Sequence, residues 1–153
     1  MGGGSMTEVV GCFHFERTVS DRVEALSAWR VTTGHADVAA TVAGLFGGAP
    51  LVKSVAEGVL LEVLTDVAAV PIAFDRVGET RVLFRLLAGY DLGLFLFCST
   101  PWRLAEIPGG GLLGGMDEQA SGELAIEPVE FRTRGGQHVM HLLPAVRVTD
   151  SGA

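Results

Sequence analysis

Lysine, cysteine and charged residues in general are scarce in this chain of 153 residues. Lys53 is the only lysine, Cys12 and Cys98 are the only cysteines, and charged residues make up 19% of the sequence, against about 25% in an average domain. Two cysteines allow at most one disulfide. This low count fits a reducing compartment, so we expect a cytoplasmic location.

Long apolar runs are also missing. The longest candidate, residues 82–98, is interrupted by Arg85 and Asp91, and a membrane helix needs about 18 uninterrupted apolar residues. We therefore expect no membrane span. The first residues carry no signal-peptide pattern. We expect residues 1–5 to be a cloning remnant, residues 6–149 to form a single domain, and residues 150–153 to be a frayed tail.

Apolar residues are abundant, at 48% of the chain, together with 21 glycines. This composition excludes a disordered chain and allows a sizeable core. The formal net charge of -7 argues against a protein that binds nucleic acid by neutralising phosphates. The excess of apolar residues indicates a surface that another protein covers.

One segment has the pattern of a helix. Val38, Val42 and Phe46 recur at helical spacing within residues 35–46, and Leu45 joins the same apolar face. Thr33 fits the N-cap, and Gly47 and Gly48 fit the C-terminal stop.

The rest of the chain reads mainly as strands, and the fold class is α+β with a mostly antiparallel sheet. A short second helix is expected at residues 101–107, capped by Thr100. Residues 16–28 read as a loop and residues 75–80 as a turn. A C-terminal hairpin is expected, with arms at residues 122–134 and 137–149. The other predicted strands are residues 9–15, 29–32, 51–55, 59–65, 70–74, 81–88 and 92–98.

No motif for cofactor or metal binding stands out. The glycine-rich residues 109–115 lack the Lys and Ser/Thr of a phosphate-binding loop and read as a linker. Cys12 and His14 share a strand face, but two further ligands would be needed for zinc. His138 and His141 point to opposite faces of a strand. We expect neither a metal nor a cofactor.

Nucleophilic and acid–base catalysis also lack a clear signature. Cys98 lies in an apolar strand and reads as an inert core thiol. Glu123 and Glu127 share a strand face, and Glu118 and Glu130 lie nearby in the sequence, but such residues usually form the solvated side of a hairpin. We therefore expect a protein that is not an enzyme, with a small enzyme using Cys98 or these carboxylates as an alternative.

Residues 102–113 hold the best candidates for contact with another protein. Trp102 opens the predicted second helix and reads either as a core anchor or as an interface residue. Leu104 follows it, and Leu112 and Leu113 lie in the glycine-rich linker, where periodicity gives them no core to join. These four residues are the predicted partner-binding site.

Several segments, taken in order, resemble the phage-type recombination directionality factors that act with large serine integrases. The order of these segments covers most of the chain, although the chain is short for that family and its glycine-rich start is reduced to Gly11. The resembling segments are residues 29–33, the helix end at 45–48, residues 64–66 and 70–72, residues 92–105 with Trp102, and residues 122–129.

The resemblance implies a protein without catalysis of its own. It would bind a serine integrase in the host bacterial cell, favour excision between attL and attR over integration, and contact DNA only through the integrase. The residues leave open a second reading, a self-associating structural or assembly protein of a phage. They do not determine the oligomeric state.

Overall fold

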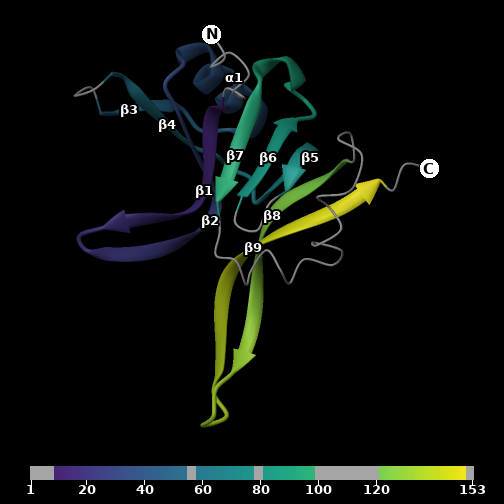
Figure 1. The fold of residues 1–153 in the computed structure, drawn as a ribbon. Coiled ribbons are helices and arrows are strands. Elements are labelled where there is room, and N and C mark those ends of the chain that lie inside the picture. Colours follow the sequence, from purple (N-terminus) through teal and green to yellow (C-terminus); the bar gives the residue numbers. More distant parts are fainter. Residues whose placement is uncertain (1–8, 55–57, 78–80, 99–120, 151–153) are drawn as a thin grey trace.

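A computed structural model describes residues 9–54, 58–77, 81–98 and 121–150 (Figure 1). These residues form one nine-stranded sheet and one α-helix, which confirms the predicted α+β fold with mostly β structure. In chain order the elements are β1 (Val9–Val19), β2 (Arg22–Thr33), α1 (Ala36–Phe46), β3 (Pro50–Ser54), β4 (Leu60–Leu64), β5 (Ala69–Val77), β6 (Arg81–Leu86), the 3-10 turn η2 (Tyr90–Leu92), β7 (Leu94–Cys98), β8 (Ser121–Arg132) and β9 (His138–Asp150).

The strands lie in the order β3-β4-β2-β1-β7-β6-β5-β8-β9. Each neighbouring pair is antiparallel except β1 and β7, which run parallel. The predicted antiparallel character is therefore correct, with one exception at the centre of the sheet.

The short connection between β4 and β5 forces the sheet to curl. These strands are second and seventh in the sheet order, so in a flat sheet they would lie about 24 Å apart. The link from Leu64 to Ala69 spans at most about 18 Å even when fully extended. The sheet must bend until β4 and β5 approach each other across its concave side.

Hydrogen bonds from this link hold the curled shape. The Thr65 amide and hydroxyl both donate to the Trp29 carbonyl, at 2.9 and 3.0 Å. The Trp29 indole N–H donates to the Ala68 carbonyl at 3.0 Å, which also accepts the Ile126 amide at 2.8 Å. Residues 65–68 therefore connect β2 to β8, although these strands are far apart in the sheet order.

The concave side encloses an aromatic core. Phe13 lies edge-to-face against Trp29, Phe84 and Phe95, with ring centroids 5.3–5.8 Å apart. Trp29 makes a further edge contact with Phe97 at 5.5 Å. All of these rings are essentially inaccessible to solvent. Such pairs add stability beyond the burial of their area.

The helix α1 covers the part of the sheet near β2 and β4 (Figure 1). The buried Val38, Val42 and Phe46 confirm the predicted apolar face, whereas Leu45, which was predicted to share it, is exposed. Gly47 follows at a positive φ of 90° and donates its amide to the Ala43 carbonyl, as a helix C-cap requires.

Two sequence predictions about the start of the chain were wrong. Residues 16–28 are not a loop, because β1 and β2 continue through them as a hairpin that turns at Ser20 and Asp21, both with positive φ. Thr33 is not the N-cap, since that position belongs to His35. The Thr33 hydroxyl instead accepts the His35 amide and donates to the Val10 carbonyl.

The C-terminal hairpin is confirmed, with β8 and β9 joined by a turn that contains Gly136 at φ 86°. Its distal half extends away from the rest of the sheet (Figure 1). Residues 75–77 belong to β5 rather than to a turn, and Asp150 is the last residue of β9 rather than part of a frayed tail. The predicted helix at 101–107 and residues 1–5 lie outside the described residues.

Two glycine substitutions of the same kind test the packing between helix and sheet. Gly48 has φ 92°, and an added Cβ would collide with the Leu64 carbonyl oxygen. We expect Gly48→Ala to lower the free energy of unfolding by about 2 kcal/mol or more. Gly44 is exposed within α1 and has open space around it, so Gly44→Ala should raise the free energy of unfolding by about 0.5–1 kcal/mol. Urea denaturation measures both, and equal effects would contradict this packing.

Candidate functional site

A cluster of polar side chains lies on the convex side of the sheet, opposite the aromatic core. The strand register brings His14 of β1 opposite Arg30 of β2, and Thr32 of β2 opposite Glu62 of β4. Side chains alternate between the two faces of a strand, so the same strands that send Phe13, Trp29 and Val31 into the core present these polar residues outward.

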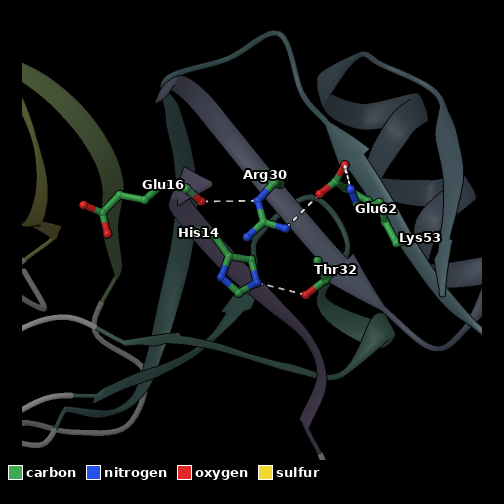
Figure 2. Close-up of polar contacts among 6 residues, drawn as sticks. All are labelled: His14, Glu16, Arg30, Thr32, Lys53 and Glu62. Atoms are coloured by element: carbon green, nitrogen blue, oxygen red, sulfur yellow. Dashed lines mark hydrogen bonds and ion pairs between the residues drawn. The ribbon is translucent and has the colours of Figure 1, made fainter. Parts of the chain in front are cut away.

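Arg30 is at the centre of this cluster. Figure 2 shows its guanidinium between the backbone carbonyl of Glu16 and the carboxylate of Glu62. The Nε–O distance to Glu16 is 3.3 Å, and the Nη1–Oε2 distance to Glu62 is 2.8 Å. The Glu16 carboxylate points away from the cluster (Figure 2). Within the described ranges, the one carboxylate that pairs with Arg30 is that of Glu62.

Glu62 is shared between two cations. The Lys53 Nζ of β3 lies 3.9 Å from its second carboxylate oxygen. The side chain of Glu62 is only 9% exposed and that of Arg30 is 18% exposed, whereas that of Lys53 is 52% exposed. The Arg30 pair is thus largely removed from water, and Lys53 remains at the surface.

His14 carries no positive charge at neutral pH. Burial is the main cause that lowers its pKa, the neighbouring Arg30 charge adds to the shift and Glu62 opposes it in part, and together they bring the pKa to about 4. Its Nε2 lies 2.9 Å from the Thr32 hydroxyl. An imidazole with so low a pKa is a weak base, which makes it a poor partner for activating a nucleophile.

A cavity of about 310 Å³ opens beside His14, between β1, β2 and β7. Cys12 and Cys98 both line it. Burial raises the pKa of the Cys12 thiol, and the proximity of Cys98 raises it further. The protonated Cys12 is therefore a weak nucleophile.

Cys98 is exposed, so the prediction of a buried core thiol was wrong. The strand β7 is central, as its sequence indicates, but the core covers mainly one of its faces. Phe95 and Phe97 are buried there, while Leu96 and Cys98 line the cavity on the other face.

The other histidines and glutamates that the sequence analysis considered do not gather into one site. His138 near the hairpin turn contacts the Glu130 carboxylate at 2.9 Å, and His141 lies three residues further along β9. Glu123 and Glu127 lie on β8 and are half-buried rather than fully solvated. Among the described residues, no three His, Cys, Asp or Glu side chains are grouped to hold a metal ion.

The four predicted partner-binding residues, Trp102, Leu104, Leu112 and Leu113, lie outside the described residues, as does Glu118. The Arg30, Glu62 and Lys53 cluster was not predicted. One signal was available, because Glu62 is the only charged residue in the apolar run 59–64. An isolated charge in such a run requires a partner when the strand is buried.

Comparisons with protein-family models, with curated proteins and with solved structures find no match for this chain. Nothing helical in the described part of the chain has the length and apolar character needed to cross a bilayer.

The cluster makes a prediction about stability. We expect Glu62→Gln to lower the free energy of unfolding by about 2–3 kcal/mol, because it leaves the Arg30 guanidinium largely buried without its carboxylate. Glu16→Gln is the matched control, since Arg30 uses only the backbone carbonyl of that residue, and its effect should stay within about 0.5 kcal/mol. Denaturant unfolding measures both variants. Similar losses for the two would contradict the pairing.

Proposed function

We propose that this chain is a recombination directionality factor that binds a large serine integrase and favours excision over integration, without catalysis of its own. The proposal starts from the ordered resemblance of its segments to that family. The observation that best supports it is that three of the segments that resemble the family contact one another in the fold.

Residues from three of these segments meet at one place. Trp29 of the first segment accepts two hydrogen bonds from Thr65 of the third. Gly47 and Gly48, at the end of the helical segment, leave room for Asp66 and for the Leu64 carbonyl. Residues that are far apart in the sequence pattern thus depend on one another in space. These contacts are compatible with segments that belong to one shared fold.

The charge of the chain is compatible with this role. At -7, the chain is poorly suited to hold DNA, so in this proposal the integrase holds the attachment sites. An acidic protein can also be steered toward a basic partner domain. We place the complex in the cytoplasm of the bacterial host.

Directionality requires only a difference in affinity. The integrase would exist in one arrangement that joins attL to attR and in another that joins attP to attB. A factor that binds the first arrangement more tightly shifts the population toward excision, whereas equal affinity for both would shift nothing.

The cavity beside β1 gives less support to an enzyme. Its residues include a thiol with a raised pKa and an imidazole with a lowered one. An activated nucleophile needs the opposite arrangement, with an acidic thiol or a competent base beside it.

Recombination of plasmid substrates in vitro tests the proposal. The purified chain is titrated into a large serine integrase encoded beside its gene, with attL × attR and attP × attB plasmids in parallel. We expect excision to rise by about 5–150-fold, which corresponds to typical coupling free energies, and integration to fall. The chain without integrase serves as the control and should recombine nothing. Unchanged yields of both reactions would contradict the proposed function.

A further inference from the structure

The strand β3 forms one margin of the sheet. It is first in the strand order and pairs only with β4. Figure 1 shows it at the end of the sheet opposite β9. Within the described residues, the outer side of its backbone has no strand neighbour. Such an edge offers unpaired N–H and C=O groups to another extended chain.

Exposed apolar side chains gather at this edge. Of the twelve large apolar side chains that are exposed among the described residues, five lie on β3, on β4 or directly before β4, with exposed fractions between 37% and 62%. These five are Leu51, Val52, Val59, Leu60 and Leu64.

The apolar residues occupy both faces of the edge. Leu51 lies opposite Glu62 and so shares its convex face, whereas Val52 lies opposite Leu61, whose side chain is buried on the core face. A strand that is apolar on both faces is typical of the interior of a sheet, where neighbours cover both sides. The strand β3 therefore exposes an apolar side chain on each face at an edge position, between Pro50 and Lys53.

The charges at the edge favour a particular occupant. Among the described residues, Lys53 and Arg30 share the carboxylate of Glu62, which leaves this cluster of three side chains with one positive charge in excess. The sequence of β3 is PLVKS and contains no acidic residue. A second copy paired through β3 would thus place a second Lys53 at the edge, with its own Glu62 already shared between two cations. An acidic residue on a foreign strand would compensate the charge of Lys53.

We propose that β3 is a docking strand, and that the partner adds to it an extended apolar segment carrying an aspartate or glutamate. Backbone hydrogen bonds would supply affinity, and the side chains on alternate faces would supply specificity, as in other cases of strand addition. The inference rests on the proposed function for the identity of the partner, the serine integrase.

Lys53 allows a direct test because it is the only lysine in the chain. A carbodiimide joins an amine to a carboxylate that touches it. In the free chain we expect coupling of Lys53 to Glu62, which lies 3.9 Å away. With the integrase present, we expect a cross-link from Lys53 to an acidic residue in an apolar integrase segment, identified by mass spectrometry.

Variants of the edge provide the second measurement. The double variant Leu51→Ser with Val52→Ser should bind the integrase about 10-fold or more weakly, because it removes apolar side chains on both faces of the strand. Met140→Ser is the matched control, since Met140 is equally exposed at 61% but lies on the distal hairpin. It should bind like the wild type. Melting curves check that each variant is folded.

The outcomes separate this inference from the proposed function. If the wild type stimulates excision and the edge variant binds with equal strength, the docking strand is wrong and the function stands. If the wild type neither binds the integrase nor stimulates excision, the proposed function is wrong, and with it the integrase as the partner of β3. A dimer that the edge variant abolishes would then identify a second copy as the occupant, and this would overturn the assignment of a foreign acidic strand.

Discussion

The four residues that link β4 to β5 determine the shape of this molecule. Thr65 bonds twice to the Trp29 carbonyl, and the Trp29 indole bonds to the Ala68 carbonyl. These contacts hold two distant parts of the sheet together around a cluster of aromatic rings. Because each strand alternates its side chains, fixing Trp29 in the core also fixes Arg30 on the outer face. A one-residue change of register in β2 would turn Trp29 outward and Arg30 into the core, where the buried guanidinium charge would be unfavourable.

The outer face and the edge follow from this closure. Because the core occupies the concave side, the charged groups around Arg30 find their ion-pair partners on the convex side. There, the carboxylate of Glu62 pairs with two cations, Arg30 and Lys53. That arrangement leaves Lys53 exposed on β3, beside apolar side chains that the fold does not cover. In the described part of the chain, residues 65–68 thus close the sheet, while the edge strand β3 stays open to pairing. This combination suits a protein that works by binding, because a preformed strand loses little entropy when a partner is added.

The sequence predicted the elements whose signals are local. The helix over residues 35–46 followed from apolar spacing and two glycines, and the C-terminal hairpin followed from Gly135 and Gly136. The hairpin of β1 and β2 was missed over residues 16–28, because a largely exposed ribbon has only weak apolar alternation to reveal it. The Arg30 cluster was missed for a different reason, since it depends on the register of three strands. The exposure of Cys98 depended on which face of β7 meets the core, and both faces of that strand are apolar.

The central claim is that a closed, stable sheet presents β3 as a strand for a partner to extend. Residue-resolved amide hydrogen exchange, with and without the proposed partner, a serine integrase, tests it most directly. The amides of Trp29 and Thr65 should exchange slowly in the free chain and in the complex, since the closure does not depend on the partner. The outward amides of β3 should exchange readily in the free chain and at least about 10-fold more slowly in the complex. A complex that forms while β3 exchanges as fast as before would contradict the account.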